Sequence, residues 1–319
     1  MEGNKLLSFV IPCYRSQNTV SKVVDEIEQT VKTRPGFDYE IILVNDGSPD
    51  NVWSVISDLA DHNSHIIGIN FSKNFGQHSA LMAGYNYCSG DYVISLDDDG
   101  QTPANELYKL VDTLEEGFDI VYASYGEVHQ NIIRRVGSRM AKAMSDYMFD
   151  IKGDKRNGSS FYIARKFVID EMINYKNAYP YTAGLILRVT RNIGFVSVTH
   201  RSRLEGRSGY SLKALINLWL NGFTAFSVKP LRIGSYVGFV SAAFGILFAI
   251  YIIIKKLFFV RDMAAGWSST ISVIMIIGGI IMIMLGLIGE YIGRIYICIN
   301  SSPQYVVKEI KNYERDNVG

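Results

Sequence analysis

Two long uncharged segments near the C-terminus constrain this chain more than any other feature. Residues 233–254 comprise 22 residues without a charge, and residues 270–289 comprise 20 more. At ~1.5 Å of rise per residue, each segment as a helix spans about the 30 Å hydrocarbon core of a bilayer. A helix that is apolar on all sides either crosses a membrane or lies in a very large core, which a chain of 319 residues does not offer. We therefore expect a membrane region at 233–294, with transmembrane helices at about 233–254 and 270–290.

The short linker at 255–267 makes these two expected spans a helical hairpin, so both ends of the chain lie on one side. Residues 188–232 carry eight Lys or Arg against a single acidic residue, Glu205. Three basic residues at the hairpin tip reduce this asymmetry, but the positive-inside rule still favours cytoplasmic termini. We expect a multi-pass protein of the cell inner (cytoplasmic) membrane, with a cytoplasmic catalytic domain at 1–210 and a cytoplasmic tail at 295–319.

The overall charge argues against a nucleic-acid partner, because 32 basic residues face 31 acidic ones. Cys13, Cys88 and Cys298 are odd in number and far apart. They predict buried thiols in a reducing compartment rather than disulfides or metal ligands. No signal peptide is expected, because the apolar run from Leu6 to Ile11 is too short and is typical of a buried first strand.

Short apolar runs alternate with amphipathic stretches through the first part of the chain. The expected strands are 6–11, 40–44, 66–70, 92–96 and 119–123, and the expected helices are 19–31, 52–60, 78–87 and 105–115. This alternation predicts an α/β fold with a mostly parallel sheet covered on both faces. Such sheets bind ligands beyond the carboxyl ends of their strands. A dinucleotide-binding Rossmann domain is a poor alternative, because the turn at 12–16 contains no glycine.

Three consecutive carboxylates follow the fourth expected strand. Asp97, Asp98 and Asp99 repel one another at a strand end, and a hard divalent cation relieves that repulsion. Oxygen ligands from Asp and from the nearby Gln101 suit Mg²⁺ or Mn²⁺. A cation held there can neutralise charge on a leaving diphosphate. The alternative is a solvated acidic turn without a metal.

A further polar cluster follows the first and second expected strands. Asp46 lies at a strand end, where its carboxylate can hydrogen-bond the base or ribose of a nucleotide. Tyr14 lies beside it and offers a ring on which a base can stack. Alone, the Asp-Gly-Ser sequence at 46–48 is only a turn signal.

Four motifs carry a resemblance through their order and spacing. They are Val10-Ile11-Pro12-Cys13-Tyr14, Val44-Asn45-Asp46-Gly47-Ser48, Ser72-Lys73-Asn74-Phe75-Gly76 and Leu96-Asp97-Asp98-Asp99-Gly100-Gln101-Thr102-Pro103. Together they resemble glycosyltransferase family 2, and most closely its polyprenyl-phosphate branch, the dolichyl-phosphate mannose synthase-like enzymes. That branch has an Asp-x-Asp-x-Gln-x-Pro run and a C-terminal pair of membrane helices.

The resemblance implies a GT-A fold, which binds nucleotide sugars. It implies a metal site at Asp97, Asp99 and Gln101, with both aspartates also counted as catalytic. The residues expected around the donor are Pro12, Tyr14, Asp46, Lys73, Gly76 and Asp98. Gly76 has no side chain and is therefore expected to let the nucleotide approach the backbone closely.

The chain departs from the family pattern at two places. Family members usually carry Asn-Glu after the tyrosine, where this chain has Arg15-Ser16. Many also carry a Gly-Asp-Phe-Arg run, and residues 158–161 occupy its place without the aspartate or the arginine. The first departure puts the nucleotide contacts of that turn in question. The second keeps a non-catalytic nucleotide-sugar-binding scaffold as an alternative.

Two basic clusters are candidates for binding an acceptor phosphate, since the arginine fork suits phosphate oxygens. The residues are Arg134, Arg135, Ser138, Arg139 and Lys142 on one expected helix, and Arg201, Arg203 and Arg207 ahead of the membrane region. Arg203 is also expected to be catalytic. The alternative is simple attraction to anionic lipid headgroups. Between them and the spans, residues 211–232 predict an interfacial amphipathic helix, at 212–228, and a linker.

The residues supply candidate metal, nucleotide and phosphate sites. Together with them, the resemblance implies an inverting glycosyltransferase that moves a sugar from a nucleotide-diphosphate sugar, UDP-linked, to a polyprenyl phosphate such as undecaprenyl phosphate. The expected product is a lipid-linked monosaccharide for cell-envelope glycan modification. The expected partners are the donor, the lipid acceptor, the bilayer and Mg²⁺ or Mn²⁺; a homo-oligomer stays open. A polysaccharide synthase is a second alternative, although the chain lacks the Gln-x-x-Arg-Trp run of those enzymes.

Overall fold

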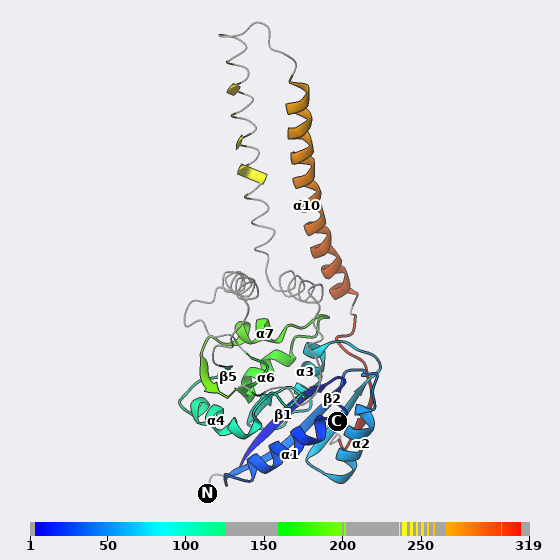
Figure 1. Cartoon of the computed structure of the whole chain (residues 1–319), viewed down its shortest axis with the longest axis vertical. Helices are drawn as coiled ribbons and strands as arrows, with labels where there is room; N and C mark the ends of the chain where they lie inside the picture. The colour runs from blue at the N-terminus through cyan, green and yellow to red at the C-terminus, as the bar shows by residue number, and fades with distance from the viewer. Residues whose placement is uncertain are drawn as a thin grey trace. The chain divides into compact units, whose positions relative to one another are not determined.

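The computed structural model describes residues 4–125, 159–199, 201, 266–300 and 302–313, together with scattered positions between 236 and 258 (Figure 1). The chain divides into two compact units. One comprises Met1–Tyr210 with Ser301–Gly319, and the other comprises Ser211–Asn300. Each unit is described separately below.

Eight strands of the described residues form one sheet in the order β7-β5-β6-β4-β1-β2-β3-β8. In chain order they are β1 (Lys5–Cys13), β2 (Phe37–Asn45), β3 (Ile66–Phe71), β4 (Tyr92–Ser95), β5 (Ile120–Tyr125), β6 (Tyr162–Arg165), β7 (Ile193–Val198) and β8 (Val307–Lys311). Parallel pairing joins β4, β1, β2 and β3, and also joins β5 to β7. Only β6 and β8 run antiparallel to their neighbours. The predicted mostly parallel sheet is therefore confirmed.

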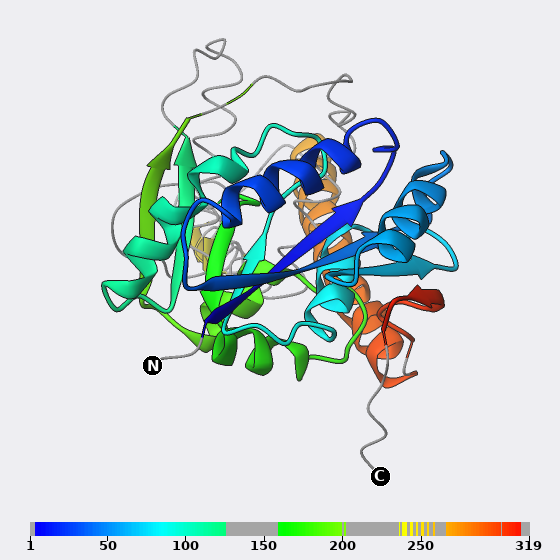
Figure 2. The same ribbon diagram turned by 90° about the horizontal axis from the view of Figure 1, so that it is seen from below.

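Helices connect these strands and cover both faces of the sheet. They are α1 (Val20–Val31), α2 (Val52–His62), α3 (Gln77–Tyr85), η1 (Ala104–Glu106), α4 (Leu107–Glu115), α6 (Lys166–Ile173) and α7 (Thr182–Val189). Apolar side chains of α1, α2 and α4 form one core with alternate residues of β1, such as Phe9 and Ile11. Helices α3, α6 and α7 contact one another on the opposite face. Figure 2 shows α1 and the green helices on opposite sides of the sheet.

One glycine explains how closely α3 approaches the sheet. A Cβ atom built on Gly84 lies 2.3 Å from Cγ1 of Val10, so any larger residue clashes with the β1 side chain. Val10 and Val44 are both fully buried beneath this helix. The small residue therefore holds α3, which begins directly after Gly76, close to the ends of β1 and β2.

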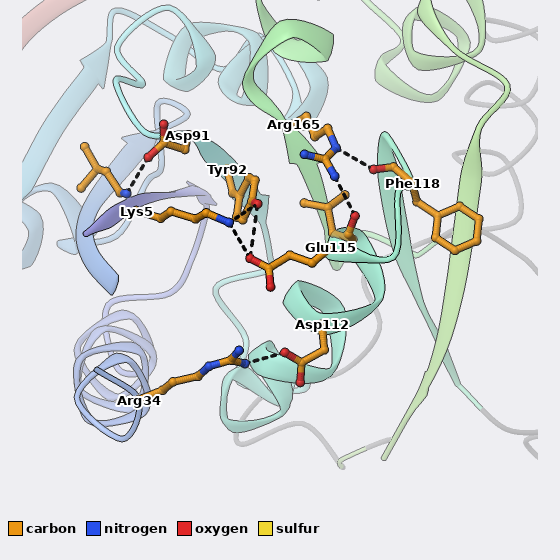
Figure 3. Close-up of polar contacts among 10 residues, drawn as sticks. Lys5, Arg34, Asp91, Tyr92, Asp112, Glu115, Phe118 and Arg165 are labelled. Atoms are coloured by element: carbon orange, nitrogen blue, oxygen red, sulfur yellow. Dashed lines mark hydrogen bonds and ion pairs between the residues drawn. The ribbon is translucent and has the colours of Figure 1, made fainter. Parts of the chain in front are cut away.

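Polar contacts tie the sheet together at the amino ends of β1 and β4, away from the candidate site (Figure 3). The ammonium of Lys5 donates to Glu115 at 2.7 Å and to the hydroxyl of Tyr92 at 2.9 Å. The guanidinium of Arg165 donates to the backbone oxygens of Leu114 and Phe118, at 2.9 and 2.8 Å. These contacts fix α4 against β1, β4 and β6.

Strands β6, β7 and β8 were not anticipated from the sequence. Residues 295–319 were expected to be only a tail, but Val307–Lys311 pair with β3 in an antiparallel register, Ile310 opposite Ile69. The pairing is irregular between Asn70 and Phe71. A five-residue edge strand with three charged side chains has a weak sequence signal, because half of it faces solvent.

In the second unit, α10 runs from Trp267 to Ile299 and contains 33 residues. It extends beyond both ends of the span predicted at 270–290. Within the described residues it is the one helix long and apolar enough to cross a membrane, with a candidate span at Ile276–Ile297. The described positions between 236 and 258 are helical. The rest of the span predicted at 233–254, and the predicted interfacial helix at 212–228, lie outside the described residues.

Candidate active site at the carboxyl edge of the sheet

The carboxyl ends of β1, β2 and β4 meet at one edge of the sheet. Cys13, the last residue of β1, pairs with Asn45, the last residue of β2. Ser95 at the end of β4 pairs with Val10 of β1. The backbone N–H of Asp46 donates to the carbonyl oxygen of Cys13 at 3.1 Å. The polar segments that follow these strands therefore start from neighbouring positions, as parallel strands require.

Asp46 is clasped by the loop that connects β3 to α3. Its two carboxylate oxygens accept the backbone N–H groups of Phe75, at 2.7 Å, and Gly76, at 2.9 Å. The side-chain amide of Asn74 donates to the backbone oxygen of Asp46 at 3.0 Å. Only 3% of Asp46 is exposed, and this burial raises its pKa to about 6, while the two amides act in the opposite direction. Asp46 thus fixes the loop at 73–76, and its contact with a nucleotide stays a prediction.

Two glycines allow this arrangement. Gly47 has a φ of 58°, and a Cβ built on it lies 2.3 Å from the carbonyl carbon of Lys73, so the two loops touch through backbone atoms. Gly76 has a φ of 92°, which disfavours any residue with a side chain. A Cβ built on Gly76 meets no atom within 4 Å. The expected close approach of the nucleotide to Gly76 stays a prediction.

The turn after β1 presents Tyr14 and Arg15 to solvent. Tyr14 is 43% exposed, so its ring is available for stacking. Arg15 adopts the left-handed conformation with a φ of 59°, and its guanidinium carbon lies 5.5 Å from the centre of the Tyr14 ring. The backbone N–H of Arg15 donates to the hydroxyl of Ser48 at 2.8 Å. A non-glycine residue in this conformation is unusual and marks a constrained turn. Pro12 is buried within β1.

Asp98 serves this same turn. Its carboxylate accepts the backbone N–H of Tyr14 at 2.9 Å. Burial, reinforced by the neighbouring carboxylates of Asp97 and Asp99, raises the pKa of Asp98 to about 6. In this structure Asp98 therefore holds the β1–α1 turn, and its predicted contact with the donor stays a prediction.

Asp97 points to different partners. One carboxylate oxygen accepts the side-chain amide of Gln77 at 3.0 Å, and the other accepts the hydroxyl of Ser160. Gln77 begins α3, while Ser160 lies just before β6, so elements far apart in sequence converge on one carboxylate. Gln77 was not among the residues predicted from the sequence. Ser160 belongs to the segment 158–161, which departs from the Gly-Asp-Phe-Arg pattern.

Asp99 and Gln101 form the rest of the acidic turn. The backbone N–H of Gln101 donates to the Asp99 carboxylate at 3.0 Å. The side-chain amide of Gln101 donates to the backbone oxygen of Arg201 at 3.3 Å. The segment that follows β7 therefore reaches the acidic turn, and Gln101 is the residue that connects them.

The oxygen atoms of Asp97, Asp99 and Gln101 fit a hard divalent cation, since carboxylates and amide oxygens are its preferred ligands. The described part of the chain contains no group of three or more His, Cys, Asp or Glu arranged to hold a metal. The assignment of Asp97, Asp99 and Gln101 as metal ligands therefore stays a prediction.

Of the predicted acceptor-phosphate residues, the structure describes Arg201. Its guanidinium donates to both carboxylate oxygens of Glu26 on α1, each at 2.9 Å, and to the side-chain oxygen of Asn105 at 2.7 Å. Arg201 thus ties the segment after β7 to α1 and η1, and its phosphate contact stays a prediction. The other predicted acceptor residues, Arg134, Arg135, Ser138, Arg203 and Arg207, lie outside the described residues. Lys73 is exposed, and its ammonium lies 5.1 Å from the centre of the Phe75 ring.

A partly buried histidine, His78, follows Gln77 at the start of α3. His78 is 3.0 Å through Nδ1 from the hydroxyl of Thr182, and its ring packs edge-on against Tyr181. Burial lowers the pKa of His78 to about 4. It is therefore neutral near pH 7 and joins α3 to α7.

Comparison with known families accounts for most of the chain. Residues 8–176 match the family described as Glycosyl transferase family 2, and residues 229–295 match the GtrB C-terminal hairpin. An undecaprenyl-phosphate 4-deoxy-4-formamido-L-arabinose transferase from Yersinia pestis (strain Pestoides F) is 34% identical over 325 residues. That alignment covers 98% of this chain and 96% of the relative. A protein of the same name from Yersinia pseudotuberculosis serotype O:3 (strain YPIII) gives the same values.

Solved structures show the same fold at lower identity. The glucosyl-3-phosphoglycerate synthase of Mycobacterium tuberculosis, in complex with Mn²⁺ and uridine-diphosphate-glucose, has a TM-score of 0.51 and 21% identity. The alignment covers 68% of this chain and 76% of the synthase chain. A further complex of that synthase, with Mn²⁺, uridine diphosphate and phosphoglyceric acid, has a TM-score of 0.51 and 20% identity, with coverage of 68% and 75%. The GT-A-like α/β fold, the ordered motifs and the family matches agree, and this chain belongs to glycosyl transferase family 2 and is a glycosyltransferase.

Proposed function

We propose that this glycosyltransferase moves a sugar from a UDP-linked donor to undecaprenyl phosphate at the cytoplasmic surface of the membrane. The observation that carries the proposal is the convergence of Asp46 and Asp97 at the carboxyl edge of the sheet. It occurs in a chain that aligns over 98% of its length with undecaprenyl-phosphate sugar transferases. The donor and acceptor assignments follow from the names of those relatives and from the chemistry of the edge.

The donor nucleotide has a binding surface of suitable composition. Tyr14 offers an exposed ring for stacking, and Gly76 leaves open space beside two backbone amides that already face a carboxylate. Lys73 is exposed on the same loop and can approach a phosphate. We propose that the base lies at Tyr14 and Asp46, with the diphosphate directed toward the acidic turn.

We propose that Asp97, Asp99 and Gln101 hold a divalent cation, Mg²⁺ or Mn²⁺, together with the donor diphosphate. The cation, when bound, neutralises the charge that develops on the leaving nucleoside diphosphate. Gln77 and Ser160 hold the Asp97 carboxylate in one orientation, so less reordering is needed when the donor binds. The structural neighbour that binds Mn²⁺ with uridine-diphosphate-glucose has the same fold, which is consistent with this assignment.

The acceptor needs no general base, because a lipid phosphate is already ionised at pH 7. One of its oxygens forms a bond to the anomeric carbon, and the bond from that carbon to the donor β-phosphate oxygen breaks, releasing nucleoside diphosphate. Inversion at the anomeric carbon is the outcome expected from the family resemblance. We propose that Arg203, with the other basic residues predicted from the sequence, screens the acceptor charge.

The sheet topology supports a hairpin in the membrane. Strands β3 and β8 are hydrogen-bonded neighbours, although α10 lies between them in the sequence. If α10 crosses the bilayer once, the chain must cross a second time before Trp267 for β8 to reach the same sheet as β3. The uncharged segment at 233–254 supplies that crossing, and the GtrB hairpin match includes it. We therefore propose two spans, with the sheet and both termini on the cytoplasmic side.

The test is turnover by the purified full-length chain in detergent. Undecaprenyl phosphate is mixed with Mn²⁺ or Mg²⁺ and a panel of UDP-sugars that includes the 4-deoxy-4-formamido-L-arabinose donor. Organic extraction and mass spectrometry then identify the lipid product. The expected result is undecaprenyl phosphate carrying one sugar, formed only with a divalent cation.

Two results would contradict the proposal. Binding of UDP-sugars without any lipid-linked product across the panel would favour the nucleotide-sugar-binding scaffold. Extension of a polymer on the first sugar would favour a polysaccharide synthase. A span count of one, from cysteine labelling on both sides of a sealed vesicle, would refute the hairpin separately.

A further inference from the structure

The segment after α10 packs against the unit that contains the candidate active site. It begins with Gln304, whose side-chain amide donates to the backbone oxygens of Tyr175 and Asn177, at 3.2 and 3.0 Å. It continues as β8 against β3. It ends at Asn312, whose side chain donates to two backbone oxygens at the start of β3. This C-terminal segment, residues 304–313, is therefore held at both ends and along its middle.

One residue of this segment packs against the strand that leads into the Asp46-binding loop. The ring of Tyr305 stacks on Phe71 at the end of β3, with ring centres 5.3 Å apart and planes 8° from parallel. Phe71 in turn contacts Phe75 edge-on, with centres 5.7 Å apart. The backbone N–H of Ser72 also donates to the carbonyl oxygen of Val306 at 3.0 Å. The C-terminal segment thus borders the loop at 72–76 at its start and, through two rings, at its end.

At its other end, this aromatic stack reaches the backbone amides that bind the Asp46 carboxylate. Phe75 carries one of the two backbone N–H groups that bind the Asp46 carboxylate, and Gly76 carries the other. Lys73 and Asn74 of the same loop also lie against Gly47 through backbone atoms. Loss of the Tyr305 ring removes the aromatic support of Phe71 and Phe75, so the loop is expected to hold Asp46 less firmly.

We propose that Tyr305 is a positioning residue for the donor nucleotide: from beyond the membrane helix in sequence, it holds the Phe75 and Gly76 amides on Asp46. The proposal rests on the proposed function, because it takes the Asp46 loop to be part of the donor site. It adds that the C-terminal segment is a component of that site. Tyr305 acts through Phe71 and Phe75 and does not itself touch the Asp46 carboxylate.

The chain offers a matched control on the same segment. Tyr313 packs edge-on against Tyr87, with ring centres 4.8 Å apart. Removing its ring therefore deletes another aromatic contact, edge-on instead of stacked, between the same segment and the domain. That contact does not involve Phe71, Phe75 or the loop at 72–76. A purely structural role of the segment predicts similar effects from Tyr305→Ala and Tyr313→Ala.

The experiment compares full-length Tyr305→Ala, Tyr305→Phe and Tyr313→Ala in detergent. Hydrogen exchange with mass spectrometry follows the peptide covering residues 72–77 in the absence of ligand. Calorimetric titration with UDP and Mn²⁺ follows donor-site affinity, with Asp46→Ala as a positive control. For Tyr305→Ala we expect faster exchange of that peptide and UDP binding weaker by about 2- to 12-fold, which corresponds to the loss of one aromatic pair. Tyr305→Phe keeps the ring and should match the wild type.

Steady-state kinetics add a readout that general destabilisation does not reproduce. Tyr305→Ala should raise the KM for the UDP-sugar while leaving the KM for undecaprenyl phosphate unchanged. Tyr313→Ala should leave both values, and the exchange of residues 72–77, as in the wild type.

Each contrary result has a distinct meaning. Unchanged exchange of residues 72–77 in Tyr305→Ala overturns the positioning role, whatever the UDP affinity of that variant is. Altered exchange with unchanged UDP affinity overturns the link from loop to donor. Equal effects of Tyr305→Ala and Tyr313→Ala on both readouts show that the segment only stabilises the domain. Failure of the wild type to bind UDP refutes the proposed donor, while the exchange data still decide whether Tyr305 holds the loop.

Discussion

The two side chains that hold Asp97 lead to a quantitative prediction about the cation site. Ser160→Ala removes the hydroxyl donor to one carboxylate oxygen and leaves the Gln77 donor in place. Asp97 is only partly buried, so water can replace some of the lost hydrogen bond. A hydrogen bond to a charged group contributes roughly 1.5–3 kcal/mol when buried. Because of this partial exposure we expect a smaller loss, about 1–1.5 kcal/mol, or a roughly 5- to 12-fold weaker Mn²⁺ affinity in the presence of UDP.

Electron paramagnetic resonance of free Mn²⁺, titrated into the protein with saturating UDP, measures this affinity directly. Ser159→Ala is the matched control, because the Ser159 hydroxyl bonds only locally to the backbone of Phe161 among the contacts described. Ser160→Thr keeps the hydroxyl and should retain most of the affinity. Thermal unfolding of each variant shows whether weaker Mn²⁺ binding comes from a destabilised fold or from a change at the site itself.

A Ser160→Ala variant that binds Mn²⁺ as tightly as the wild type, or more tightly, would refute this reasoning. It would show that the serine hydroxyl competes with the cation for the Asp97 oxygen instead of orienting it. Equal weakening in Ser159→Ala and Ser160→Ala would show that the turn before β6, and not the hydroxyl, is what matters.

Three further predictions concern the metal, the pH dependence and the acceptor. Asp99→Ala and Gln101→Ala should fold yet lose turnover, and EDTA should stop the wild type; full activity of Asp99→Ala in chelator would contradict the metal site. The pKa of Asp46 is about 6 in the folded state against an ordinary 3.8, so the folded state binds the proton more tightly. Protonation of Asp46 therefore stabilises the folded state fully below pH 4. This stabilisation is lost as the pH rises toward 6, so the free energy of unfolding falls by roughly 3 kcal/mol, at 1.36 kcal/mol per pH unit. Chemical unfolding of ligand-free wild type and Asp46→Asn across this range should show a steeper loss of stability in the wild type. The slope that remains in the variant comes from Asp98, whose pKa is also about 6, and equal slopes in the two proteins would contradict the prediction. Arg203→Ala in neutral micelles should lower kcat/KM for polyprenyl phosphate by about 10- to 150-fold with nucleotide affinity intact, and Arg203→Lys should recover part of it; wild-type kinetics there would assign Arg203 to headgroup attraction.

The first five strands of the sheet were predictable from sequence because they are largely buried, whereas β6 and β7 were not anticipated. The five expected strands all correspond to observed ones, and 66–70 differs from β3 by one residue. The expected helices match α1, α2, α3 and α4, with the last preceded by the short turn η1. Apolar runs of this kind leave a clear signal. In contrast, β8 depends on an edge pairing with a strand more than 230 residues away, which no local pattern reveals.

The candidate site was predictable at the level of strand ends but not of side-chain partners. Motif order brought Tyr14, Asp46 and Asp97 to one edge, as the structure shows. Gln77 carries no distinctive signal, since a polar first residue is ordinary in a helix. Ser160 was noticed only as part of residues 158–161, which lack the aspartate and the arginine of the Gly-Asp-Phe-Arg run. Hydrogen-bond partners that are far apart in sequence are brought together by tertiary packing. Local sequence patterns do not reveal that packing.

The three aspartates show how the structure changes the argument for a cation. Repulsion among three adjacent carboxylates was one reason to expect a metal, but each carboxylate has its own hydrogen-bond donors. Asp97 accepts from two side chains, Asp98 from the backbone N–H of Tyr14 and Asp99 from that of Gln101. Repulsion is therefore relieved in part without a metal, and charge density alone does not require one. The case for the cation rests instead on the chemistry of a leaving diphosphate, the family membership and the side chains that hold Asp97 in place. It follows that Asp98 should tolerate replacement by Asn for metal binding, whereas Asp97 and Asp99 should not.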